Sequence, residues 1–213
     1  MDFRLTEEQE LLLESLREVM ARDCTEDYMK ECNEKHEYPQ KFVDALTEAG
    51  FGMLGVPEEY GGTPVDITTM MLVAQEICRL GGPHFVFGQA LSIRDMLEFG
   101  SEEQKSQCME EVMNGRVGFV LGFTEPQAGS DSSAIATAFT RKNGKVYING
   151  HKSFMSNAVR AKYMLCMARN ADEDPDATKR NAFSMWWMPM DAPGVRVEQL
   201  SKIGWHMLDT CEV

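Results

Sequence analysis

Basic clusters are scarce in this sequence. It holds 21 Lys and Arg against 34 Asp and Glu, a formal net charge of −13. The densest basic sites are the pairs Arg141-Lys142 and Lys179-Arg180, which we interpret as solvated turns. Because a phosphate backbone is bound mainly through positive charge, this balance argues against nucleic acid as a partner.

Long hydrophobic runs are missing as well. No apolar stretch approaches the ~18 residues that a membrane-spanning helix requires. The N-terminal segment "MDFRLTEEQE" is acidic and lacks the charged-then-apolar layout of a signal peptide. We therefore expect a cytoplasmic protein with no membrane insertion.

Cysteine motifs are absent, although the chain has six cysteines, at positions 24, 32, 78, 108, 166 and 211. They form no C-x-x-C pair, and no His stands at metal-ligand spacing from them. Free thiols, mostly buried, are the expectation, with neither disulfides nor a metal site.

What the sequence does have is enough apolar content, 43% of 213 residues, for a sizeable core in one or two domains.

Its first half has helical patterns. The Thr6 to Gln9 capping box, Thr-x-x-Gln, predicts a helix start. The apolar face that follows is made of Leu12, Leu16, Val19 and Met20.

Further helices are predicted over residues 39–49, 67–80 and 84–98, and Gly50 is placed to end the first of these in a left-handed conformation. A second capping box, Ser101 to Gln104, begins another helix that ends near residue 115. We therefore predict an N-terminal all-helical domain over residues 1–116.

From Val117 the pattern changes to short runs rich in β-branched and aromatic residues, bounded by Gly, Asn, Asp or Pro. Asn143-Gly144 predicts a type I′ hairpin. The segment "NADEDPDATKR" is expected to be an exposed, mobile loop. We predict an α+β fold in which residues 117–213 form an antiparallel β domain. The final run "LDTCEV" is typical of the start of a strand, so we expect this chain to be a fragment of a larger protein.

The adjacent Trp186 and Trp187 lie on one of these predicted strands, so their side chains should point to opposite faces. For both, packing in a core or an interface is favoured over ligand contact.

A polar, kinked loop follows the first predicted strand: "LGFTEPQAGSDSSA", residues 121–134. Within it, Gly129 lets the backbone turn tightly, and consecutive amides there can bind an anion, with the Thr124 and Ser130 hydroxyls as further donors. The alternative is a polar loop satisfied by itself, in which Glu125 and Asp131 accept amide hydrogen bonds. Composition alone leaves both interpretations open.

Five segments in order, "LTEEQELL", "GVPEEYGG", "TEPQAGSD", "YINGHKSFMSNA" and "LSKIGWHMLDTCEV", together resemble the acyl-CoA dehydrogenase family of flavoproteins over essentially the whole chain. "TRKNGKVYING" and "KIGWHML" further resemble its bacterial branch that includes crotonobetainyl-CoA reductase of carnitine metabolism. The resemblance implies an N-terminal helical domain and a middle β domain, with the family's C-terminal helical bundle absent from this chain.

The resemblance implies that FAD lies against the middle domain. Main-chain groups near Leu121 and Phe123, with the Thr124 hydroxyl, would meet the pyrimidine side of the flavin. Gly129 and Ser130 would lie at the pyrophosphate, and Ser130 also at the thioester arm of the substrate. These positions correspond to the family's "Y-x-V-T-E-P" segment and the loop after it.

The family's "W-I-T" segment corresponds to Phe154, Met155 and Ser156. An aromatic ring there would lie against the flavin face, and the hydroxyl would hydrogen-bond to flavin N5. Phe in place of Trp keeps a π surface but loses area and an N–H donor. Ser in place of Thr keeps the hydroxyl but loses the methyl group that restricts its rotamer.

The implied activity is hydride exchange between the β-carbon of an acyl-CoA or enoyl-CoA thioester and flavin N5, with an electron-transferring flavoprotein as redox partner and a homo-oligomer as the full-length state. The family's catalytic glutamate belongs to the C-terminal bundle, so no catalytic residue is assigned and this chain alone is expected to be inactive. Two alternatives stay open: a truncated homologue that acts as a non-catalytic binding or assembly module, and an acyl-CoA oxidase.

Overall fold

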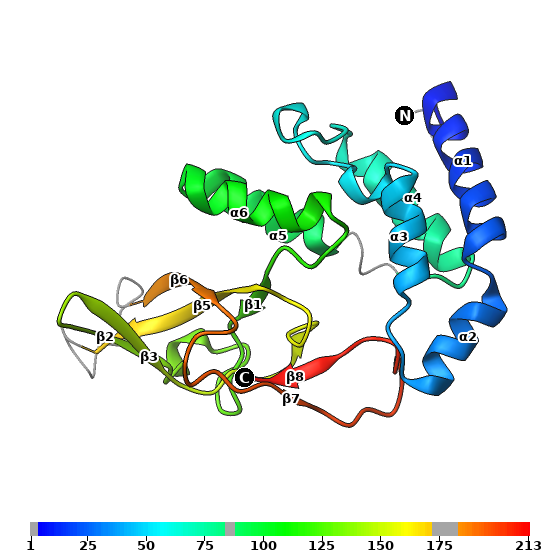
Figure 1. Cartoon of the computed structure of the whole chain (residues 1–213). Helices are drawn as coiled ribbons and strands as arrows, with labels where there is room; N and C mark the ends of the chain where they lie inside the picture. The colour runs from blue at the N-terminus through cyan, green and yellow to red at the C-terminus, as the bar shows by residue number, and fades with distance from the viewer. Residues whose placement is uncertain (1–3, 84–87, 172–182) are drawn as a thin grey trace. The chain divides into compact units, whose positions relative to one another are not determined.

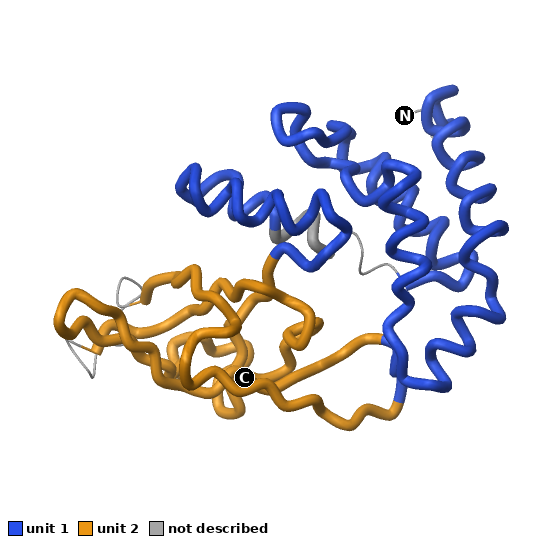
Figure 2. The backbone as a smooth tube through the Cα atoms, in the orientation of Figure 1, with its two compact units in different colours: residues 1–118, 204–207 blue, residues 119–203, 208–213 orange. Residues whose placement is uncertain are grey.

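The computed structural model describes residues 4–83, 88–171 and 183–213. It divides into two compact units, coloured separately in Figure 2: unit 1 is Met1–Gly118 with Gly204–Met207, and unit 2 is Phe119–Ile203 with Leu208–Val213. Among the described residues, every helix is too short or too polar to cross a membrane.

Unit 1 is built from helices (Figure 1). Its elements are α1 (Glu7–Asp23), α2 (Glu26–Lys35), α3 (Gln40–Glu48), α4 (Ile67–Arg79), α5 (Gly88–Phe99) and α6 (Glu102–Met113), with short 3₁₀ turns at Phe51–Met53 and Glu58–Tyr60. Because α1 packs on both α3 and α4, their apolar faces meet in one core. Side chains that are fully buried there include Leu16, Phe42, Leu46, Val73 and Ile77.

Both predicted capping boxes are confirmed. Gln9 N donates to Thr6 Oγ1 at 3.2 Å, and Thr6 N donates back to Gln9 Oε1 at 3.1 Å. Ser101 and Gln104 exchange the same pair of bonds at the start of α6. The left-handed Gly50 (φ 85°) follows α3 as predicted. The start of the helix expected at residue 84 lies outside the described residues.

The helix α2 is absent from the sequence prediction. Thr25 caps it by accepting a hydrogen bond from Tyr28 N at 3.3 Å, and only Met29 and Cys32 of its residues are buried. Two buried side chains give too little apolar periodicity to distinguish a helix from a polar loop.

Unit 2 contains two β-sheets. The larger sheet is formed by β1 (Val120–Gly122), β2 (Ala138–Lys142), β3 (Lys145–Asn149), β5 (Tyr163–Asn170) and β6 (Phe183–Pro189). The smaller sheet has the order β4 (Met155–Ser156), β8 (Thr210–Glu212) and β7 (Glu198–Gln199), all antiparallel. The β8 pairing confirms that "LDTCEV" contains a strand.

The larger sheet is mixed, which corrects the purely antiparallel sheet expected from the sequence. β6 pairs antiparallel with β5, whereas β1 and β2 both pair with β5 in parallel. The chain between β1 and β5 spans about forty residues and includes the β2–β3 hairpin, so it is long enough for the crossover that parallel pairing requires. The composition of a strand does not indicate whether it pairs with its neighbour in parallel or antiparallel.

The hairpin between β2 and β3 has the predicted turn. Asn143 (φ 54°) and Gly144 (φ 71°) are both left-handed, and the register pairs Lys142 with Lys145. Trp186 and Trp187 point to opposite faces of β6, as expected: Trp186 packs edge-on against Phe139 at 4.7 Å, and Trp187 stacks on Tyr163 at 4.6 Å. The expected mobile loop over 170–180 lies mostly outside the described residues.

All six cysteines are free thiols, and five are buried. Burial raises the pKa of Cys108 to about 12. The exception is Cys78, which is exposed on α4.

Candidate functional site

The kinked loop begins where β1 ends. Glu125 N donates to Ala128 O at 2.9 Å, and Ala128 N donates to Glu125 O at 3.0 Å, which closes a tight turn over Pro126 and Gln127. Proline is suited to the first of these central positions because its φ is already fixed near the required value. The backbone therefore reverses within four residues and leaves Gly129 and the residues after it at the surface.

A buried ion pair holds this turn. Lys152 Nζ lies 2.8 Å from Glu125 Oε1, and both side chains have an exposed fraction of only 2%. The ammonium also donates to Phe123 O at 3.2 Å. Glu125 accepts three further bonds, from Ala136 N at 2.7 Å, Thr137 N at 3.0 Å and the Gln127 amide at 2.6 Å. One carboxylate thus fixes the turn, the start of β2 and the segment that carries Lys152.

The same contacts set the protonation state of Glu125. Burial by itself raises the pKa of this carboxyl, but the hydrogen bonds from Lys152, Thr137 and Ala136 outweigh it and lower the pKa from 4.5 to about 2. The group is therefore a carboxylate at neutral pH, and its negative charge is matched by the ammonium beside it.

The segment that follows Lys152 runs beside the turn. Ser153 N donates to Thr124 O at 2.8 Å, and two residues later β4 pairs Met155 with Cys211 and Ser156 with Thr210. Within unit 2, residues 121–125 and 152–156 are therefore joined by a main-chain bond and a buried ion pair. Sequence separation gives no indication of this proximity.

Backbone strain marks the second segment. Phe154 (φ 59°) and Asn157 (φ 62°) are both left-handed, a conformation that side chains with a Cβ rarely adopt. Phe154 also has 67% of its surface exposed. Strained backbone residues cluster at functional sites, so the exposed ring of Phe154 is a candidate for ligand contact.

Six of the eight predicted site residues lie in these two segments and the other two, Gly129 and Ser130, follow the tight turn; their side chains differ in accessibility. Met155 is buried, so only its main chain is available to a ligand. Thr124 is half-buried. The others are exposed: Leu121, Phe123, Gly129, Ser130, Phe154 and Ser156.

The alternative interpretation, a loop whose polar groups are hydrogen-bonded within the protein, is correct for part of the segment. Glu125 accepts two main-chain amide bonds. Asp131 accepts hydrogen bonds from the Ser133 hydroxyl at 2.6 Å and from Ser133 N at 3.0 Å, and these bonds lower the pKa of Asp131. The hydroxyls of Thr124, Ser130 and Ser156 are different, since none has a hydrogen-bond partner within the described parts of the chain. The loop's two carboxylates, Glu125 and Asp131, are thus structural, whereas the hydroxyls of Thr124, Ser130 and Ser156 are available.

Sequence analysis did not identify two residues that support the site. Lys152 is one, although its place in the run "KVYINGHKSFM", three residues before Met155, was a usable signal for a buried cation. Arg169 is the other: its Nη2 donates to Ser133 O at 2.7 Å and so ties the loop after Ser130 to β5. No local pattern indicates that contact, because it joins residues 36 positions apart.

Comparisons with known proteins identify both parts of the chain. Residues 6–116 match the N-terminal domain of acyl-CoA dehydrogenases, and residues 120–213 match their middle domain. A curated relative, the probable acyl-CoA dehydrogenase YdiO of Escherichia coli strain K12, is 47% identical over 100% of this chain and 55% of its own length. The chain thus spans about half the length of the curated relatives that it matches.

Solved structures are similar over the same extent. A glutaryl-coenzyme A dehydrogenase in complex with glutaryl-CoA is 28% identical with a TM-score of 0.85, over 100% of this chain and 54% of that one. A structure described as the electron transferring flavoprotein of Acidaminococcus fermentans is 27% identical with a TM-score of 0.84, over 100% and 56%. With both domain types matched in order along nearly its whole length, this chain belongs to the acyl-CoA dehydrogenase family.

Proposed function

We propose that this chain is the N-terminal and middle-domain part of an FAD-dependent acyl-CoA dehydrogenase or enoyl-CoA reductase. The observation that carries the proposal is the junction of two segments in unit 2. The Ser153 to Thr124 bond and the Lys152–Glu125 pair join the two segments that carry the Thr124 and Ser156 hydroxyls and the exposed ring of Phe154.

The residues present fit a flavin. Leu121, Phe123 and Phe154 offer exposed apolar surface of the kind a flat ring can cover. Gly129 has open space where a Cβ would stand, so a phosphate group can approach its backbone. The buried Oδ1 of Asn157 accepts no hydrogen bond from any described residue, which leaves one unsatisfied acceptor next to Ser156.

A bound FAD would supply hydride acceptance or donation at its N5 atom. The protein's part is position and electrostatics. Phe154 would lie against the ring, the Ser156 hydroxyl would donate toward N5, and the Thr124 hydroxyl with its neighbouring main chain would hold the pyrimidine side. Ser130 would donate to the pyrophosphate and to the thioester arm of the substrate.

Substrate and partner are proposed from the relatives. Glutaryl-CoA is bound in one similar structure, which favours an acyl-CoA or enoyl-CoA thioester here. An electron-transferring flavoprotein is the proposed redox partner. The full-length protein is proposed to be a cytoplasmic homo-oligomer. Its proposed role is in fatty acid or carnitine metabolism, similar to that of crotonobetainyl-CoA reductase. No residue of this chain is assigned as the catalytic base.

A chimera tests this function. Residues 1–213 would be followed by the part of YdiO beyond its aligned segment, and the purified protein mixed with a panel of acyl-CoA and enoyl-CoA thioesters. We expect flavin bleaching by at least one acyl-CoA, with re-oxidation faster by electron-transferring flavoprotein than by oxygen; the reverse preference indicates an oxidase. A chimera that folds but binds no FAD would favour a non-catalytic module.

A further inference from the structure

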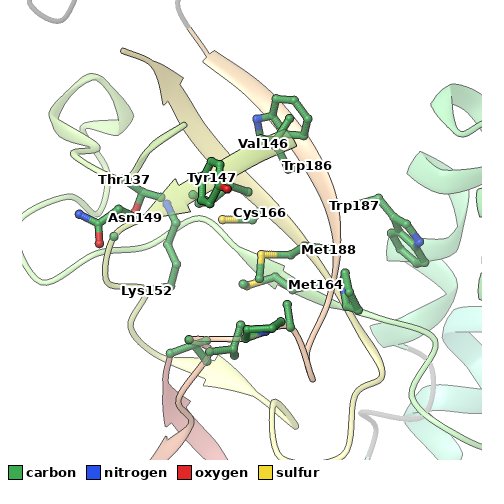
Figure 3. A pocket seen from close by; sticks show the side chains of 18 of the residues that line it. Thr137, Val146, Tyr147, Asn149, Lys152, Met164, Cys166, Trp186, Trp187 and Met188 are labelled. Carbon is green, nitrogen blue, oxygen red and sulfur yellow. The ribbon is translucent and has the colours of Figure 1, made fainter. Parts of the chain in front are cut away.

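Lys152 has an unusual place for a cation, because its side chain lies directly behind β1. Of the Lys and Arg residues that the structure describes, only Lys152 is buried. A Cβ on Gly122 would stand 3.5 Å from Lys152 Cγ and 2.6 Å from Met164 Sδ. Figure 3 shows the extended Lys152 side chain beside Met164 and Cys166 of β5. Because Gly122 has no side chain, the Lys152 stem can lie close to the main chain of β1.

The Lys152 ammonium ends on the main chain of the proposed flavin segment. Its Nζ donates to Phe123 O at 3.2 Å and to Glu125 Oε1 at 2.8 Å. The remaining hydrogen bonds of the Glu125 carboxylate go to Gln127 and to the main chain just before β2. Of the two charges in this pair, therefore, it is the ammonium that binds the Phe123–Thr124 peptide.

That contact fixes the direction of the Phe123–Thr124 peptide. The peptide bonds of the described chain are all trans, and in a planar trans peptide the C=O and the N–H point to opposite sides. Since Phe123 O faces the Lys152 ammonium, the Thr124 N–H faces away from it. Among the described residues this N–H has no hydrogen-bond partner. It is therefore a donor left for a ligand.

The ammonium also changes the strength of that donor. A cation on the carbonyl oxygen draws electron density away from the N–H of the same peptide, and hydrogen bonds linked in this way strengthen one another by roughly 10–30% each. The Lys152 and Glu125 side chains are only 2% exposed, so water screens the ammonium weakly. The Thr124 N–H is thus a stronger donor to a negatively charged atom than an ordinary main-chain amide.

We propose that Lys152 is a positioning residue for the flavin, which directs the Thr124 N–H toward the ring and polarises it. The inference rests on the proposed function, in which the main chain at Thr124 lies at the pyrimidine side of FAD. Two-electron reduction adds negative charge at that end of a flavin, and a preorganised donor aimed at a developing charge stabilises the charged state. Lys152 therefore raises the reduction potential of the bound cofactor.

The affinities of oxidised and reduced FAD test this role. The double variant Glu125→Gln/Lys152→Met removes the ammonium from Phe123 O and leaves no unpaired charge in the interior. NMR titrations of the 213-residue chain with oxidised FAD, and under nitrogen with dithionite-reduced FAD, give the two dissociation constants. We expect the preference for reduced over oxidised FAD to be about tenfold lower in the double variant. For a two-electron couple this ratio corresponds to a reduction potential about 30 mV lower.

A second variant separates charge from position. Glu125→Gln/Lys152→Gln keeps a neutral donor within reach of Phe123 O, so we expect an intermediate preference; it also keeps more of the buried hydrogen bonds if the first variant does not fold. The matched control is Arg17→Met/Glu76→Gln, which removes another ion pair with a buried carboxylate, in unit 1, and should leave the preference unchanged.

The chain without FAD gives an independent measurement. In Glu125→Gln/Lys152→Met the ¹³C resonance of the Phe123 carbonyl should move upfield, as it does when a carbonyl loses a hydrogen bond, and in the Arg17→Met/Glu76→Gln control it should stay in place. An unchanged resonance overturns the inference. FAD contact at Thr124 with equal preferences in the native chain and both Lys152 variants also overturns it, while the flavin site itself stands. Absence of FAD contact at Thr124 in the native chain refutes the proposed function, and the role of Lys152 with it.

Discussion

The buried Lys152–Glu125 pair should account for a large share of the stability of unit 2. Replacing Lys152 with Met removes the cation and leaves a buried carboxylate with only neutral donors, from Ala136, Thr137 and Gln127. Removing one partner of a buried pair typically costs about 3–5 kcal/mol. Since Glu125 keeps three hydrogen bonds, we expect Lys152→Met to lose about 3 kcal/mol, at the lower end of that range.

The opposite single change should cost more. In Glu125→Gln the Lys152 ammonium stays buried, with the Phe123 carbonyl and a neutral amide as its neighbours, so about 4–5 kcal/mol is expected. The double variant removes both charges and should lose clearly less than the two single losses added together. Urea unfolding of the four proteins, followed by Trp fluorescence, gives a coupling energy that we expect to be about 2 kcal/mol or more.

The pair also predicts a pH dependence. Because the pKa of Glu125 is lowered from 4.5 to about 2, its contribution is complete above pH 4.5 and is lost as the pH falls toward 2. The difference in unfolding free energy between the native chain and Glu125→Gln should shrink over that interval. A coupling energy near zero, or a difference that does not change with pH, would refute the role assigned to this pair.

Three further predictions concern other parts of the chain. Gly150→Ala should destabilise unit 2 by about 1–3 kcal/mol in thermal unfolding, because the new Cβ would stand 2.1 Å from Thr137 Oγ1, whereas Gly204→Ala, with open space, should have little effect. Thr6→Ala should lose about 1 kcal/mol by removing a helix cap, and an unchanged urea midpoint would contradict this. One thiol, Cys78, should react rapidly with a chromogenic disulfide reagent and all six after unfolding, and Cys78→Ser should abolish the rapid phase.

The sequence predicted those features of the fold that depend on residues close together in the chain. The capping boxes at Thr6 and Ser101 and the Asn143-Gly144 turn each depend on residues within a few positions of one another, and all three are present. By contrast α2 was missed because only Met29 and Cys32 of it reach the core. Parallel pairing in unit 2 was missed because a strand's composition does not encode its neighbour's direction.

The candidate site shows the same difference between what sequence patterns indicate and what long-range contacts determine. Thr124 and Ser156 were chosen through resemblance to a family, and the structure places both on segments joined by a single main-chain bond. The groups that join these segments were not predicted. Burial of the Lys152 ammonium depends on a carboxylate 27 residues away, a contact that exists only once the sheet has formed.

Direct mapping of flavin contact is the decisive measurement. FAD can be titrated into the ¹⁵N-labelled 213-residue chain and amide shifts followed by NMR, which detects even weak binding. We expect shifts concentrated at Thr124, Ser130 and Ser156, reduced in Ser156→Ala and unchanged in the exposed control Ser201→Ala. Shifts confined to other surfaces, or no shifts at saturating FAD, would contradict a flavin site at this junction.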